Sequence, residues 1–194
     1  MIAPRSLPAL ATPGRIATPG RIAATAAVGA AVEAVNLWRF GWSPPLGAYV
    51  VFGAVATAVS ATDIALRRVP NRAVLAALLP GAALLALASG LDATWWPLAR
   101  AGIAMVVLAG FYLALGLAFP SGMGMGDVKW AAVTGLFLGW ISWPAVATGT
   151  LLSFAGAALF VTVRYVAAPG CRRAVLAMAP FMAAGALVAI LVVR

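Results

Sequence analysis

Long apolar stretches recur along the whole chain, and this pattern restricts the fold more than any other feature of the sequence. Several reach the roughly 20 residues that an α-helix needs to cross a hydrocarbon core about 30 Å thick. Only 9% of the residues are charged, against about 25% in a soluble domain, so a water-soluble fold could not cover its surface. The strongest stretches are Leu46–Leu66, Ala73–Ser89, Leu98–Phe119, Val128–Trp140, Ala145–Val163 and Ala174–Val193.

An alanine-rich stretch, Ile22–Trp38, precedes these and contains Glu33. A signal peptide fits its basic start and its length, but a cleavage site just before Glu33 or Trp38 would be poor. A first membrane helix fits better, because the segment from Arg39 to Trp42 is typical of an exit into the membrane interface. The sequence therefore predicts an all-α fold, a polytopic transmembrane bundle of about six to seven helices.

The chain divides into a short tail and one membrane domain. The hexapeptide ATPGRI occurs at residues 11–16 and again at 17–22 and is rich in proline and glycine. Residues 1–21 are therefore predicted to form a disordered basic tail. Residues 22–194 are predicted to form a single membrane-embedded domain.

The positions of the arginines and of the tryptophans both predict how the chain is oriented in the membrane. With the N terminus in the cytoplasm, only Arg39, Arg100 and Arg194 lie outside, and the other cationic residues lie inside. The net charge of +9 thus indicates topology, and no nucleic-acid partner is expected. The predicted location is the inner or plasma membrane. The same threading gathers six tryptophans at the outer interface: Trp38, Trp42, Trp95, Trp96, Trp140 and Trp143.

Two aspartates fall at the cytoplasmic ends of different apolar stretches. Asp63 lies near the end of Leu46–Leu66, and Asp127 lies just before Val128–Trp140. A carboxylate in or beside a membrane span marks a functional site with a partner by default, and here the natural partner is the other acid. The alternatives are a helix N-terminal cap for Asp127 and a surface ion pair for Asp63.

Paired carboxyl groups suit peptide hydrolysis. Two like charges a few ångströms apart cannot both ionise, so one carboxyl stays protonated while the other takes a proton from a shared water. Serine and cysteine catalytic triads have little support, because the chain has no histidine and only Cys171 as a thiol. No cofactor is expected and no metal site, since any metal would have to be held by carboxylates alone.

Two motifs surround these acids. Gly124-Met125-Gly126-Asp127-Val128-Lys129 carries a GxGD pattern, and residues 63–71 read DIALRRVPN. Together they resemble the signature of type IV prepilin peptidases, which are GxGD intramembrane aspartyl peptidases. The resemblance runs from about Arg21 to the C terminus.

The resemblance implies Asp63 and Asp127 as the catalytic pair. Gly124 and Gly126 would permit the backbone turn that aims Asp127 at its partner. Lys129 would be a supporting residue, and its alternative is a plain topology charge. Arg67, Arg68 and Arg72 are expected outside the site, because they would repel a basic leader.

The implied activity is removal of a short basic leader from a prepilin or pseudopilin, just before its hydrophobic N-terminal helix, at the cytoplasmic face. The partners would be this precursor and the lipid bilayer. Because the sequence has no CxxC pair, it resembles the short, peptidase-only members, and no methyltransferase activity is expected.

Two other functions compete with this one. A small transporter or ion-coupled protein could use the same aspartates, but it would be expected to hold its acids near mid-membrane and to contain broken helices. A non-catalytic scaffold of a secretion system is the second, and the presence of both aspartates argues against it. Gly102, Gly110 and Gly116 are expected to be close helix contacts.

Overall fold

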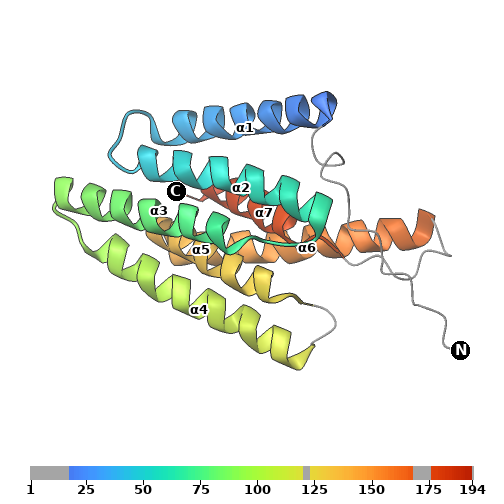
Figure 1. The fold of residues 1–194 in the computed structure, drawn as a ribbon. Helices are drawn as coiled ribbons and strands as arrows, with labels where there is room; N and C mark the ends of the chain where they lie inside the picture. The colour runs from blue at the N-terminus through green and yellow to red at the C-terminus, as the bar shows by residue number, and fades with distance from the viewer. Residues whose placement is uncertain (1–17, 120–122, 168–175, 194) are drawn as a thin grey trace, which may run out of the picture.

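The computed structural model describes residues 18–119, 123–167 and 176–193, which contain seven α-helices and no strand. The predicted all-α bundle is confirmed (Figure 1). By length and composition, α2, α3, α4 and α6 could each cross a membrane, and α7 is a shorter apolar helix. The helices are α1 (Pro19–Phe40), α2 (Leu46–Leu66), α3 (Asn71–Leu91), α4 (Trp96–Ala118), α5 (Met125–Ile141), α6 (Trp143–Ala167) and α7 (Ala179–Val192).

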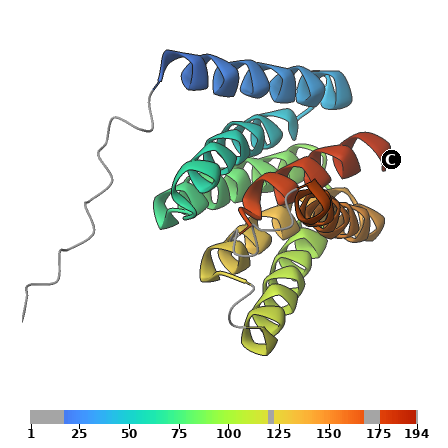
Figure 2. The same ribbon diagram turned by 90° about the vertical axis from the view of Figure 1, so that its right-hand side faces the viewer.

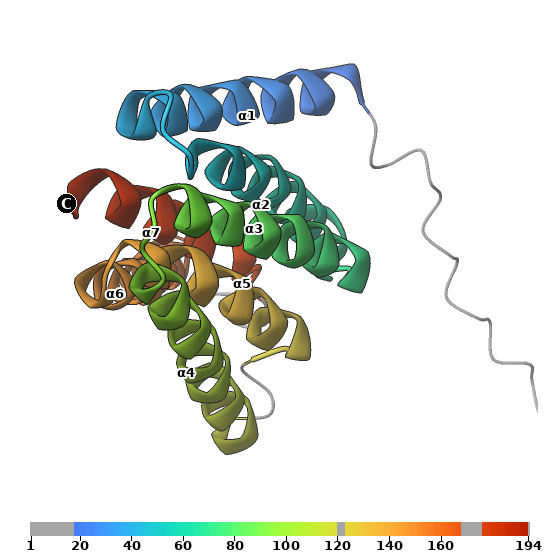
Figure 3. The same cartoon turned by 90° about the vertical axis from the view of Figure 1, so that its left-hand side faces the viewer.

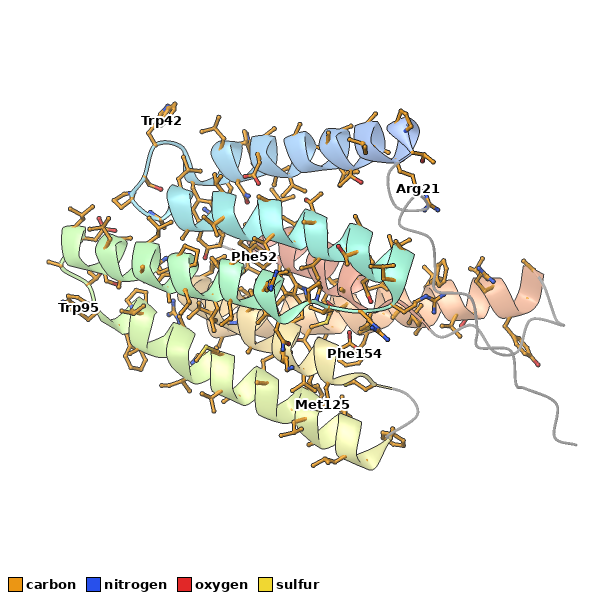
Figure 4. The ribbon with its side chains drawn as sticks, in the orientation of Figure 1. Arg21, Trp42, Phe52, Trp95, Met125 and Phe154 are labelled. Atoms are coloured by element: carbon orange, nitrogen blue, oxygen red, sulfur yellow. The ribbon has the colours of Figure 1, made fainter. Side chains whose placement is uncertain are left out.

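The two ends of the bundle differ in character. At one end α2 finishes with Asp63 in its last turn, and α5 begins with Asp127; we call this the acid end. Trp42 and Trp95 lie at the opposite end, which we call the tryptophan end (Figure 4). These two indoles are 92% and 60% exposed, as expected of side chains that settle at a membrane interface.

Prolines lie at the start of every helix except α5. α2 begins directly after Pro45 and ends where predicted. α7 begins at Ala179, later than the predicted start at Ala174, because Pro180 has no N–H and fits only the first turn. For the same reason α1 begins at Pro19, inside the predicted tail. The remainder of that tail lies outside the described residues.

α5 is the buried centre of the bundle, and α3, α4, α6 and α7 all pack against it (Figures 2 and 3). Gly135 and Gly139 allow α4 to approach closely. A Cβ at Gly135 would lie 2.6 Å from the Ala104 carbonyl oxygen, and one at Gly139 would collide with the Ala104 side chain. Small residues at this spacing let helix backbones meet without a hydrophobic driving force.

The expectation for the glycines of α4 is wrong. A Cβ at Gly102, Gly110 or Gly116 would meet no atom within 4 Å. The close contact is made instead by alanines of α4 against glycines of α5. Glycine is needed where the partner backbone approaches, and the apolar stretch does not reveal which face that is.

Arginines at the tryptophan end bind the carbonyls that helix C-termini leave unsatisfied. Arg100 donates hydrogen bonds to the carbonyl oxygens of Gly139, Trp140 and Ile141 at distances of 2.6, 2.5 and 2.7 Å. Arg39 likewise donates to the Ile190 carbonyl oxygen at 2.9 Å, near the end of α7. The positive charges also complement the negative ends of the helix dipoles.

Candidate active site

Asp63 joins α2 to the beginning of α7. Its side chain is only 5% exposed, and its Oδ2 accepts a hydrogen bond of 3.1 Å from the backbone N–H of Ala179, the first residue of α7. Such an N–H has no partner within its own helix, and the positive end of the helix dipole favours a negative charge beside it. The start of α7 therefore both holds and stabilises this carboxylate.

Asp127 is the third residue of α5 and lies over the first turn of that helix. Its Oδ2 accepts a hydrogen bond of 3.2 Å from the Gly124 N–H, and its own N–H donates to the Gly124 carbonyl oxygen at 3.0 Å. An acid in this position caps the helix and complements its dipole. Capping and chemistry are compatible, because the cap holds the carboxylate in one orientation.

The two acids line one cavity of about 680 Å³ at the acid end. The last turn of α2, the segment that follows it and the first turn of α5 form its walls, together with Leu176 just before α7. Asp63 and Asp127 come from segments far apart in the sequence, so only the tertiary fold brings them together. The prediction placed both acids at one end of the bundle, as they are.

Gly126 and Gly124 have different surroundings. A Cβ at Gly126 would lie 3.2 Å from the Cβ of Val69, tighter than most side-chain contacts. Glycine here lets the start of α5 approach the segment after α2. Gly124 has φ −86° and ψ 150°, which any residue can adopt, and a Cβ there would make only ordinary contact with Asp127.

Lys129 connects the two sequence motifs. Its Nζ donates a hydrogen bond of 2.9 Å to the Oδ1 of Asn71, the first residue of α3. Both residues are exposed. The contact joins the segment that carries Asp63 to the helix that carries Asp127, so Lys129 has a structural partner in addition to any effect of its charge on topology.

A model of the type IV leader peptidase family matches residues 50–192. The chain belongs to this family. The match contains both aspartates and both motifs. It begins within α2, whereas the resemblance was expected to begin near Arg21, so α1 lies outside the match. Neither a curated protein nor a solved structure matches the chain.

In this member of the leader peptidase family, two cationic residues that were predicted to lie outside the site are part of it. Arg67 and Arg68 line the cavity, whereas Arg72 is not part of its lining. They were predicted to hold the loop on the cytoplasmic side and to repel a basic leader. Two acids that share a cavity carry negative charge, and neighbouring guanidinium groups offset it.

Two further contacts of the candidate site in this leader peptidase were not predicted from the sequence. Asn71 belongs to the DIALRRVPN motif, yet its partner Lys129 could not be identified without the fold. The Ala179 N–H has no sequence signal except Pro180, which marks the start of a helix but not what that start contacts. Within the described ranges, no cluster of three or more His, Cys, Asp or Glu side chains could hold a metal ion.

Proposed function

We propose that the chain is an aspartic endopeptidase that removes a short basic leader from a prepilin or pseudopilin. The observation that carries this proposal is the cavity lined by both Asp63 and Asp127, inside the segment that the family model matches. A peptidase needs a base for water and an acid for the leaving amine. A pair of carboxyl groups in one cavity supplies both.

The reaction would proceed without a covalent intermediate. One aspartate, ionised, takes a proton from a water molecule as the water oxygen attacks the carbonyl carbon of the scissile peptide. The other, protonated, donates a hydrogen bond to the developing oxyanion. Collapse breaks the C–N bond, and the amine leaves with a proton from the acid pair. The products are a leader with a new carboxylate and a mature protein with a free amine.

The position of the acids at one end of the bundle suits a precursor with a hydrophobic helix. That helix can remain in the bilayer beside the enzyme while the leader junction reaches the cavity. We place the acid end at the cytoplasmic face of the inner or plasma membrane, because the arginines of the sequence favour that side. The cleavage requires neither a cofactor nor methyl transfer.

The transporter alternative has less support. Asp63 lies in the last turn of α2 and Asp127 in the first turn of α5, and neither is near the middle of its helix. Pro80 lies inside α3, and the helix continues through it. A transporter would be expected to hold its ion between broken helices near the centre of the membrane.

The proposal is tested with a co-expressed precursor that carries a basic leader, a glycine at the junction and a hydrophobic helix. We expect Asp63→Asn and Asp127→Asn each to lower the cleavage rate at least roughly a hundredfold, because each removes a proton-transfer group. Cleavage is followed by gel shift, and membrane insertion is measured in parallel. Asp92→Asn is the matched control, since Asp92 is exposed at the tryptophan end.

The control should cleave at the wild-type rate. Normal cleavage by either inserted Asp63→Asn or Asp127→Asn protein would exclude the paired mechanism.

A further inference from the structure

A buried polar contact holds α1 against α2 near the tryptophan end. Asn36 is fully buried there, and its Nδ2 donates to the Tyr49 carbonyl oxygen at 2.9 Å and to the Glu33 Oε2 at 3.2 Å. Gly53 makes the space for this contact, because a Cβ would lie 2.7 Å from the Glu33 Oε1. Val32 and Asn36 are the only buried residues of α1.

Toward the acid end, α1 and α2 diverge (Figures 1 and 3). A groove of about 340 Å³ opens here between α1, α2 and α7; we call it the α1 groove. Small and apolar side chains line it, among them Ala24 and Val28 of α1, Ser60 and Ile64 of α2, and Pro180 and Ala184 of α7.

The α1 groove leads to the candidate active site. Ile64, which lines the groove, follows Asp63 directly, and Pro180 follows the residue whose N–H binds Asp63. A neighbouring depression shares Ala61 and Ile64 with the groove and Thr62 with the cavity of the two acids. A continuous series of lining residues thus runs from the groove to Asp63.

We propose that the α1 groove holds the hydrophobic helix of the precursor while its leader junction lies at the two acids. This inference rests on the proposed function and adds the docking surface. α1, which lies outside the family match, would then be a side wall for substrate.

The spacing of the lining residues fits a helix better than a lipid chain. On α2 they recur from Ala56 through Ser60 to Ile64, two helical turns or about 12 Å along the axis. Ala56 and Ser60, four residues apart, are small enough to let another helix backbone approach closely, which stabilises helix pairs in membranes. A mobile acyl chain gains little from such a surface.

Filling the groove tests the proposal kinetically. Ala24→Trp and Ala184→Trp place an indole in the groove from two different walls, at exposed positions where the bundle need not repack. We expect each to raise KM for the precursor about tenfold and to leave kcat nearly unchanged, because binding is lost and the acids are untouched. Ala27→Trp is the control, since Ala27 is exposed on α1 and does not line the groove.

Crosslinking tests occupancy without cleavage. Ala184→Cys is made in a Cys171→Ser, Asp127→Asn background and combined with precursors that carry single cysteines along their hydrophobic helix. We expect disulfides at one depth of that helix, at precursor positions three or four residues apart on one face, and none with Ala27→Cys in the same background. Crosslinks to a second copy of the enzyme, or none to the precursor, would overturn the docking site.

The two proposals fail in different ways. Wild-type cleavage together with wild-type KM values for Ala24→Trp and Ala184→Trp rejects the groove and leaves the peptidase standing. If the wild-type protein cleaves no leader-bearing precursor, the proposed function itself is wrong, and the groove proposal falls with it.

Discussion

Each acid of the candidate site accepts a hydrogen bond from the N-terminal end of a helix. Ala179 begins α7 and binds Asp63, while Gly124 precedes α5 and binds Asp127. Both helix dipoles favour an ionised carboxylate, whereas burial and the like charge of the other acid oppose ionisation. In the proposed catalytic pair, such a balance would leave one carboxyl ionised and the other protonated.

Gly126 and Gly124 provide a matched test of how α5 is positioned. We expect Gly126→Val to lower the cleavage rate roughly a hundredfold, because its side chain would push against Val69 and displace Asp127. Gly124→Ala should stay within about twofold of wild type, since it keeps the N–H and fits the backbone. The measurement is the precursor gel shift with equal amounts of inserted enzyme. Equal losses in both variants would contradict this account.

Among the single residues of the candidate site, the two acids could be singled out from the sequence, but few of the groups that contact them could. Asp63 and Asp127 could be identified because a charged group in an apolar chain is conspicuous and because motifs surround both. The Ala179 N–H could not, because a backbone donor has no residue type. Arg67 and Arg68 were visible in the motif, yet their place in the cavity depends on the path of the chain after α2.

Among the elements, α5 depends most on its neighbours. Eleven of its 17 residues are buried, and its contact with α4 leaves no space at Gly139. Arg100 and the Tyr49 hydroxyl, which donates to the Phe137 carbonyl oxygen at 2.8 Å, hold its far end. The depth of Asp127 is therefore determined by contacts along the whole helix.

Two glycine variants separate the crowded helix face from the open one. Gly139→Leu should destabilise the bundle by about 1–3 kcal/mol or prevent its folding, because the side chain would overlap Ala104. Gly110→Leu should change stability by less than about 0.5 kcal/mol, since it faces open space. Thermal unfolding in detergent measures both. A larger loss for Gly110→Leu would show that the helix faces are assigned wrongly.

Helix boundaries were predictable where proline or a charged segment follows the apolar stretch, as for α2. The start of α7 was placed too early because the residues before Ala179 are also apolar, and hydropathy alone does not stop there. Close helix contacts were expected at the glycines of α4, whereas the glycines of α5 make them, because both stretches contain glycines. Choosing between them requires the direction in which each face points.

At the scale of the whole molecule, the bundle has two unlike ends. Exposed tryptophans lie at one end, and the acids and their cavity lie at the other. The proposed orientation places the acid end in the cytoplasm, because most cationic residues of the sequence then lie on that side.

Cysteine labelling tests this orientation. In a Cys171→Ser background, Thr94→Cys at the tryptophan end should react with a membrane-impermeant maleimide in intact cells. Val166→Cys, near the end of α6 and 73% exposed, should react only after lysis. The reverse pattern would place the acids outside the cell and exclude a cytoplasmic leader as the substrate.

The shortness of α5 would constrain the proposed substrate as well as the enzyme. Its 17 residues extend about 26 Å, less than the roughly 30 Å thickness of the hydrocarbon core. With Ile141 held by Arg100 at the tryptophan end, Asp127 is expected to lie slightly below the opposite membrane surface. An intact helix shields its amide bonds, so the proposed precursor would have to fray at that depth before water could attack. Residues that weaken the first helical turn after the junction should then speed maturation.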